Sequence, residues 1–174
     1  LQVLTERDVL ESDWVGWFND PKHCEFTKHH YFPASFESQR GILESCITDN
    51  RIQLGVVDKE NPAQICGVVS LSEIDLLHRQ ATVAASLCVE RTKSNPFIYY
   101  EAFSLMLAHG FQQFGLEKIY GGTFHPHVVE PLVRMFNFEV EGVFKRHVYK
   151  NGTFHDSTFM SVFRDTVKYF NADE

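Results

Sequence analysis

The chain has few basic residues and no long apolar run. Its 174 residues contain 16 Lys and Arg against 23 Asp and Glu, which gives a net charge of −7 with histidine neutral. Without a basic cluster to contact phosphates, nucleic acid is not an expected partner. No apolar run approaches the roughly 20 residues that a membrane-spanning helix needs, so no membrane partner is expected either.

Cysteine pairs are also absent. Four cysteines stand about twenty residues apart with no CxxC pair and no histidine at ligand spacing: Cys24, Cys46, Cys66 and Cys88. Neither a zinc site, a redox dithiol nor a disulfide framework is predicted from this spacing. We expect four reduced, mostly buried thiols in a cytoplasmic protein. Because Leu1 is not a native start, we expect upstream residues, and the sequence says nothing about a targeting signal.

Several enzyme signatures are missing as well. The chain has no G-x-S-x-G nucleophile elbow, no phosphate-binding P-loop and no dinucleotide fingerprint. What it has in excess is aromatic residues, 14% of the total, with 16 Phe. Most of these rings fall at apolar positions of predicted helices and strands. The others concentrate in residues 26–36 and at Phe97.

Capping residues and apolar spacing predict two helices near the N-terminus. One begins at Thr5-Glu-Arg-Asp8 and stops at Asn19-Asp20-Pro21. The other begins at Ser35. Residues 22–33 between them show no period, and we interpret them as a loop.

Strand and turn signals dominate the rest of the chain. Strands are expected at 52–57, 64–74, 80–89, from Ile119, and at 138–149 and 154–163 around the hairpin turn Asn151-Gly152. Helices are expected from Ser94-Asn95-Pro96 to about Phe114, and over 129–136. With residues 1–4 as the stump of a truncated first strand, the order is βααβββαβαββ. This order predicts one domain, residues 1–174, of mixed α/β (α+β) class around one sheet with helices on both faces.

Four passages stand in an order that one protein family shares. They are Trp17-Phe-Asn-Asp-Pro21; Ile65-Cys-Gly-Val-Val-Ser-Leu71 with Ile74-Asp75; Glu101-Ala102 with Phe114-Gly-Leu-Glu-Lys-Ile119; and Phe138-Glu-Val-Glu-Gly142 with Lys145-Arg-His-Val-Tyr-Lys-Asn-Gly152, His155-Asp156 and Met160-Ser161. Together they resemble the GCN5-related N-acetyltransferase (GNAT) superfamily. Within it they resemble the RimJ/RimL-like branch, which includes nucleotide-sugar amine acetyltransferases.

The resemblance implies a fold and a co-substrate. The implied fold is a single, mostly antiparallel central sheet of about six to seven strands. Acetyl-CoA is the implied acetyl donor, held in a splay between two parallel strands, with its pyrophosphate on backbone N–H groups at a helix start; no metal is implied. The implied cofactor-binding residues lie at the end of one strand and in the loop before this helix: Val89, Arg91, Lys93, Ser94, Asn95, Phe97, Ile98 and Tyr99.

The sequence departs from the family pattern at several of its characteristic positions. Asn95 and Phe97 stand where the family has the glycines that let backbone approach phosphates. Ala84 stands where many members have a catalytic carboxylate. Pro126 and Val133 stand where the family has an Asn and a Tyr that is often credited as the general acid. The usual catalytic roles therefore do not transfer to these positions.

Other residues are candidates for the chemistry and for the acceptor. Glu73 or Asp75, at the end of a predicted strand, could act as a base; the alternative for Glu73 is an ordinary strand-end carboxylate facing water. His125 and His127 follow a predicted strand and could carry a proton, or be loop histidines without a role. The acceptor-binding residues are expected in the N-terminal loop region and beside this base: Trp17, Asn19, His30, Phe32 and Glu73.

We therefore predict an enzyme, an N-acetyltransferase that moves acetyl from acetyl-CoA to a primary amine by direct attack. The acceptor could be an amino-sugar nucleotide, a protein N-terminus or a small amine, and a homodimer is left open. One alternative is a GNAT-fold binding or assembly module that has lost catalysis. Another is an acyltransferase that uses a longer acyl-CoA.

Overall fold

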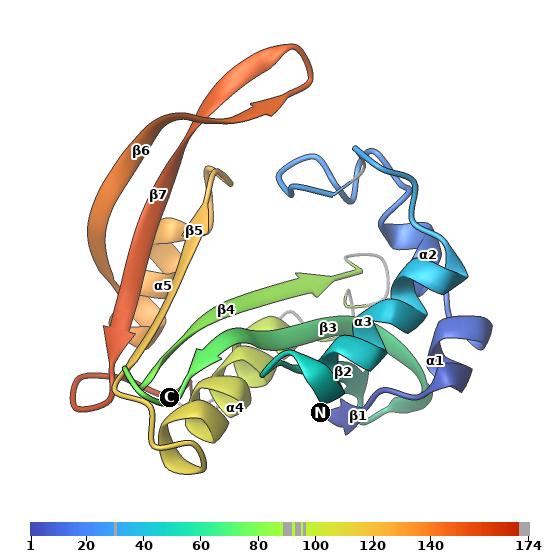
Figure 1. Cartoon of the computed structure of the whole chain (residues 1–174), viewed down its shortest axis with the longest axis horizontal. Coiled ribbons are helices and arrows are strands. Elements are labelled where there is room, and N and C mark those ends of the chain that lie inside the picture. The colour runs from blue at the N-terminus through green and yellow to red at the C-terminus, as the bar shows by residue number, and fades with distance from the viewer. Residues whose placement is uncertain (30, 89–91, 93–94, 96, 171–174) are drawn as a thin grey trace.

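A seven-stranded sheet organises the chain, in a computed structural model that describes residues 1–29, 31–88, 92, 95 and 97–170. The strand order across the sheet is β1-β2-β3-β4-β5-β7-β6 (Figure 1). The strands are β1 (Gln2–Val3), β2 (Ile52–Asp58), β3 (Asn61–Asp75), β4 (Gln80–Leu87), β5 (Lys118–Thr123), β6 (Glu139–Lys150) and β7 (Thr153–Phe163). Only β4 and β5 pair in parallel among these neighbours, so the predicted mixed fold with one mostly antiparallel sheet is confirmed.

Helices cover both faces of the sheet, as predicted. One face carries the long helix α4 (Ile98–Gln112) and the short helix α5 (Val129–Phe136). The other face carries α1 (Glu6–Glu11), α2 (Trp14–Trp17) and α3 (Phe36–Thr48), beside β1 and β2 (Figure 1).

Each face has its own apolar core. Side chains from β3, β4, β5 and β7 pack under α4 and α5, with Leu71, Met106 and Phe136 fully buried. A smaller cluster on the opposite face surrounds Trp14 and Trp17. Apolar packing thus covers both faces of the sheet. The second cluster lies towards β1 and β3, and it does not cover the strands nearer the centre, where other side chains occupy this face.

Two predicted helices differ in detail from the structure. The first predicted helix is broken, because Ser12 has an extended backbone (ψ 168) and its hydroxyl accepts the N–H of Trp14 at 3.2 Å. A serine side chain here replaces a helical backbone bond and turns the chain. Helix α4 begins at Ile98, later than the predicted start. Asn95 forms an Asx turn instead, since its Oδ1 accepts the N–H of Phe97 at 3.0 Å.

The final hairpin follows its turn signal. Asn151 and Gly152 both have positive φ, 51° and 79°, as a two-residue turn of type I′ requires. The turn joins β6 and β7, with Lys150 opposite Thr153.

The four cysteines are free thiols, two of them buried (Cys24 and Cys66) and two half-buried (Cys46 and Cys88). Burial raises the pKa of the Cys24 and Cys66 thiols. Over the part of the chain that the structure describes, no helix is both long enough and apolar enough to cross a membrane.

Candidate active site

The two parallel strands at the centre of the sheet separate after a short contact. Residues 80–82 of β4 pair with residues 118–120 of β5, and the strands then diverge (Figure 1). Gly121 lies where they part, and a Cβ there would stand 3.1 Å from the carbonyl oxygen of Val83. The sheet is therefore open beyond this last pair, between two strands that lie at its centre.

Side chains on β4 alternate between the two faces of the sheet at this opening. Ala81 and Val83 are buried in the core beneath α4. The residues between and after them, Thr82, Ala84 and Ser86, therefore point to the opposite face. Ala84 is exposed although it lies in a central strand, so solvent reaches the middle of the sheet here.

Glu73 lies beside this opening. Its Oε2 accepts a hydrogen bond from the Thr82 hydroxyl at 2.8 Å. Glu73 has a φ of 52°, at an irregularity where the β3–β4 pairing skips from Ser72 to Asp75. A bulge with left-handed backbone is costly for a non-glycine residue, and such bulges often re-aim a side chain near a functional site. Here the bulge brings the carboxylate to Thr82.

His23 contacts the same strand, at Ser86, four residues after Thr82. Its Nε2 lies 2.8 Å from the Ser86 hydroxyl, across 63 residues of sequence. The ring lies 6.1 Å from both the Trp17 and Phe18 rings. Burial lowers the pKa of His23, and Asp20 opposes this only in part, so the imidazole is neutral at pH 7. A neutral imidazole can accept a proton.

These two side chains stand on either side of Ala84. On the same face of β4, Thr82 lies two residues before Ala84 and is hydrogen-bonded to Glu73. Ser86 lies two residues after Ala84 and is hydrogen-bonded to His23. Residues two apart on a strand are about 6.6 Å apart. Ala84, which has no polar side-chain group, is therefore flanked on β4 by a carboxylate and by a neutral imidazole.

The loop between α2 and α3 is closed at its base by Asn19. The Asn19 Nδ2 donates to the carbonyl of Ala34 at 2.9 Å, and its Oδ1 accepts the Ala34 N–H at 2.8 Å. The Nδ2 also donates to the carbonyl of Val15 at 3.2 Å. Asn19 thus joins the two ends of the loop.

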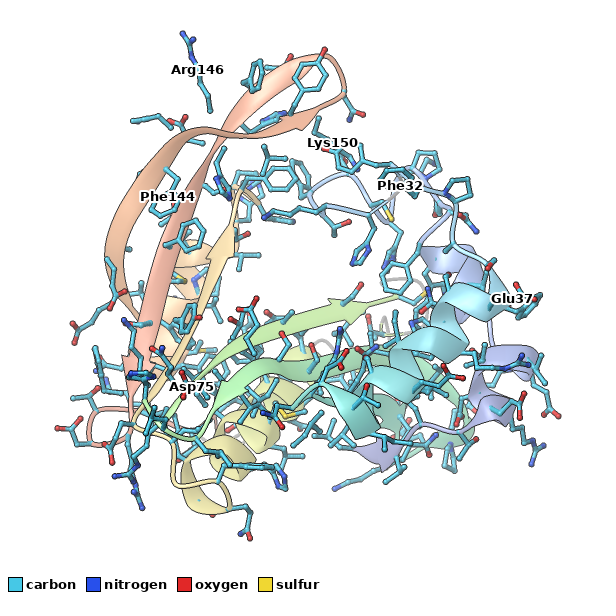
Figure 2. All side chains as sticks on the ribbon, in the orientation of Figure 1. Phe32, Glu37, Asp75, Phe144, Arg146 and Lys150 are labelled. Carbon is cyan, nitrogen blue, oxygen red and sulfur yellow. The ribbon has the colours of Figure 1, made fainter. Side chains whose placement is uncertain are left out.

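The far end of this loop touches the β6–β7 hairpin. The Lys150 ammonium donates to the carbonyl of His29 at 2.7 Å and lies 4.7 Å from the centre of the Tyr31 ring. The Tyr31 hydroxyl donates to the carbonyl of Tyr149. Figure 2 shows Lys150 between the hairpin and the loop that carries Phe32. Loop and hairpin thereby connect the two sides of the opening between β4 and β5.

The residues predicted to bind the acceptor lie in different environments. Trp17 is 5% exposed and belongs to the smaller core, and the amide of Asn19 is bonded within the loop. Phe32 is 88% exposed, and His30 lies outside the described residues. Of the predicted set, Glu73 is the residue whose side chain reaches β4 beside the opening.

The two histidines after β5 form a separate group. His125 Nδ1 accepts the N–H of His127 at 3.1 Å, and the His125 ring lies 4.5 Å from the ring of Phe26 in the loop. Burial lowers the pKa of His125, and the neighbouring His127 lowers it further. His125 is five residues after Tyr120, which pairs with Thr82, and two residues beyond the end of β5. The two histidines therefore follow the end of β5, past the pair at which β4 and β5 part.

The predicted cofactor residues divide into described and undescribed ones. Those outside the described residues are Val89, Arg91, Lys93 and Ser94. Phe97 is the N-cap of α4, with no side-chain bond to the first turn, and its ring stacks on Phe170 at 5.6 Å. Ile98 is buried, and Tyr99 stacks on Phe103 at 5.6 Å. Burial raises the pKa of Tyr99, which keeps its phenol neutral.

Two further features bear on the chemistry. Among the described residues, no group of three or more His, Cys, Asp and Glu could hold a metal ion. Asp75, close to Glu73, is bonded within the β3–β4 turn, where it accepts from the backbone of Leu77 and His78 and lies 2.8 Å from the His78 ring.

His23 and Ser86 are the candidate residues that sequence reasoning missed. His23 lies in a stretch with no periodic pattern, and nothing local links it to a serine on a distant strand. The one available signal is the alternation of β4, which places Thr82 and Ser86 on the same face as Ala84.

A central sheet that opens between two parallel strands, with helices on both faces, is the fold predicted from the resemblance to the GNAT superfamily. A spermidine N-acetyltransferase from Vibrio cholerae, solved with CoA and spermine, superposes with a TM-score of 0.81 at 21% identity, over 95% of each chain. A structure described as a probable acetyltransferase superposes with a TM-score of 0.75 at 18% identity, over 94% of this chain and 92% of the other.

Sequence comparison points the same way. YoaA, an uncharacterized N-acetyltransferase of Bacillus subtilis (strain 168), is 22% identical over 132 residues, which are 75% of this chain and 67% of that protein. No protein-family model matches the chain. The predicted resemblance to the GNAT superfamily is confirmed, and the protein has the fold of an acyl-CoA-dependent N-acetyltransferase.

Proposed function

We propose that the protein is an N-acetyltransferase that moves the acetyl group of acetyl-CoA to a primary amine. The observation that carries this is the exposed Ala84 at the opening of the sheet, flanked by Glu73 on Thr82 and by His23 on Ser86. The named activities of the similar proteins support the same class, and the spermidine acetyltransferases among them support a small amine as the acceptor.

The described residues of the phosphate loop fit an anionic co-substrate. Helix α4 presents the positive end of its dipole at Phe97, which is its N-cap and offers no side-chain acceptor to the first turn. The Phe97 ring is not free to fill this position, because it is stacked on Phe170 of the C-terminal segment. We infer that the ring itself does not obstruct a bound pyrophosphate, although Phe97 still places a Cβ where the family has a glycine.

Acetyl-CoA supplies an activated thioester carbonyl; the protein must supply a neutral amine. A free primary amine is protonated at pH 7 and needs a base. We assign this role to Glu73, whose carboxylate is exposed and oriented by Thr82. His23 is a second proton acceptor on the other side of Ala84, since burial keeps it neutral. The amine nitrogen then attacks the carbonyl carbon and the C–S bond breaks. The proton that the nitrogen loses on forming the amide goes to the CoA thiolate, and CoA leaves as the free thiol.

Release of free thiol tests the proposal. The purified chain is mixed with acetyl-CoA and a panel of primary amines, and thiol formation is followed with and without each amine. We expect amine-dependent thiol release. A thermal shift with CoA alone, but no thiol release with any amine, would instead favour a binding module. Thiol release only with longer acyl-CoA thioesters would favour a different acyl donor.

Three narrower assignments are proposals from the sequence. They are membership of the RimJ/RimL-like branch, a cytoplasmic location and a homodimer. Gel filtration with light scattering tests the last of these directly.

A further inference from the structure

Basic side chains without carboxylate partners gather on the same face of the sheet as Ala84. Arg51 lies directly before β2, and its Nη2 donates to Gln53 Oε1 at 2.7 Å. Its Nε is buried and has no hydrogen-bond partner among the described residues. Among those residues, no carboxylate oxygen lies within the 4.0 Å of an ion pair from either Arg51 or Lys150.

Strand pairing connects Arg51 to the opening of the sheet. Gln53, the partner of Arg51, pairs with Ser70 of β3, and Ser70 pairs with Ala84 of β4. Gln53 and Ser70 are 8% and 6% exposed. Two strand spacings, about 10 Å, therefore separate the backbone at Gln53 from that at Ala84. Gln53 and Ser70 thus form a polar row across the sheet. The row leads from the Arg51 guanidinium to Ala84, which lies between Glu73 and His23.

Lys150, at the end of β6, adds positive charge where the hairpin meets the loop between α2 and α3. The Lys150 residue is 5% exposed, and its ammonium contacts the carbonyl of His29 and the Tyr31 ring. After burial, the charges of His23, Lys150 and Arg51 are what lower the pKa of His29. The permanent charges of Lys150 and Arg51 therefore both act on this one imidazole.

Glu141, on the edge strand at the other end of the sheet, is a carboxylate that is already engaged. Glu141 is bonded to Lys118 at 2.6 Å and to the Ser161 hydroxyl, and both contacts lower its pKa. Buried basic groups without a counter-charge are costly, and in a binding site a ligand commonly supplies the missing charge. A chain of net charge −7 nevertheless keeps its basic groups unpaired at this site.

We propose that the amine acceptor also carries an anionic group, a carboxylate or a phosphate, which Arg51 binds while the amine lies beside Ala84. This inference rests on the proposed acetyltransferase function and deepens it. An arginine guanidinium matches both groups, because its planar fork can donate two parallel hydrogen bonds to either. A polycation such as spermidine would meet like charges at this end of the site.

Substrate preference of the unaltered chain tests the inference without any variant. Thiol release from acetyl-CoA is measured with amines matched in length: γ-aminobutyrate against butylamine, O-phosphoethanolamine against propylamine, and spermidine. We expect kcat/KM to be higher for the anionic member of at least one pair. The pair that shows the preference distinguishes a carboxylate from a phosphate. Equal or higher values for the neutral amines, or for spermidine, would overturn the inference and leave the proposed function intact.

Arg51→Ala and Arg51→Lys test the residue itself. Arg51→Ala should lower kcat/KM for the preferred anionic amine by about 10- to 100-fold, the range for a lost charge-assisted contact, and leave its neutral partner unchanged. Arg51→Lys should lose less. Arg40→Ala is the matched control, since Arg40 lies on the surface of α3 and forms an ion pair with Glu6 of α1. Equal losses with both amines would overturn the assignment to Arg51. Absence of thiol release with every amine would overturn the proposed function, and this inference with it.

Discussion

The two faces of the central strands are built from alternating residues and have different properties. On β3, Leu71 is fully buried under α4, whereas the next residue, Ser72, lies on the opposite face beside Thr82. On β4, Val83 is buried and Ala84 is exposed. Around the opening, one face is therefore packed into the larger core, and the other presents a polar surface. Because the two faces share one backbone, the packing of the first positions the groups of the second.

The largest expected effect separates the two faces by stability. Leu71→Ala should lower the free energy of unfolding by about 2–5 kcal/mol, since it removes a fully buried side chain and leaves a cavity under α4. Ser72→Ala, one residue away, should change it by no more than about 0.5 kcal/mol. Urea denaturation followed by circular dichroism measures both. Similar losses for the two variants would contradict the division of roles between the faces.

The next effect concerns catalysis on the polar face. Glu73→Gln should lower kcat by about 100-fold or more, because the amide cannot take the proton from the amine. Stability should change little, since the glutamine can still accept from Thr82. Steady-state thiol release measures the loss, and Glu11→Gln on α1 is a surface control. His23→Gln should lower kcat less than Glu73→Gln does. A larger loss of kcat in His23→Gln would assign the role of base to His23.

A smaller effect is expected where the loop closes over the polar face. Asn19→Ala removes the bonds to Ala34 and Val15 and should destabilise the fold by about 1–2 kcal/mol. Limited proteolysis should show faster cleavage in the loop. Asn19→Asp keeps the bond from the Ala34 N–H and loses the two bonds that Nδ2 donates, so its loss should be intermediate. Unchanged cleavage in Asn19→Ala would mean that other contacts hold the loop.

The smallest effect is a pH dependence of stability. The pKa of His23 is lowered in the folded chain, so above pH 6.5 the residue is neutral in both states and contributes no difference. As the pH falls below this value, the unfolded chain takes up the proton first, and the free energy of unfolding decreases until the folded histidine is protonated too. His29 and His125 act in the same direction.

Denaturation at pH values from 7.5 to 5 measures this decrease. His23→Gln should make the fall shallower. A steeper fall in His23→Gln would mean that protonation of His23 favours the folded state, contrary to the burial of its ring.

Much of the fold follows from local patterns, and the exceptions have local causes. The Asn151-Gly152 turn, the alternating strands and helix 129–136 could be predicted because each depends on backbone preferences of neighbouring residues. The break between α1 and α2 could not, because the apolar spacing continues through it and only the Ser12 side chain ends the helix. The start of α4 differs since the Asn95 side chain binds Phe97 in a turn.

The candidate site could be predicted only in part. Glu73 was accessible to sequence reasoning through strand periodicity, but its bond to Thr82 depends on a bulge that periodicity does not reveal. Nor could the contact of the Phe97 ring with Phe170 be predicted, because Phe170 lies 73 positions further along the chain.

The sequence by itself determined the order of the elements, the turns, and which residues of each strand share a face, because these depend on contacts between near neighbours. Only the tertiary structure decided that the loop histidine His23 meets Ser86, that Glu73 reaches Thr82, and that Arg51, two strands away from Ala84, has no carboxylate partner among the described residues. These meetings depend on how strands pair and how a loop folds back over them. Such long-range packing brings together residues whose separation along the chain carries no local signal.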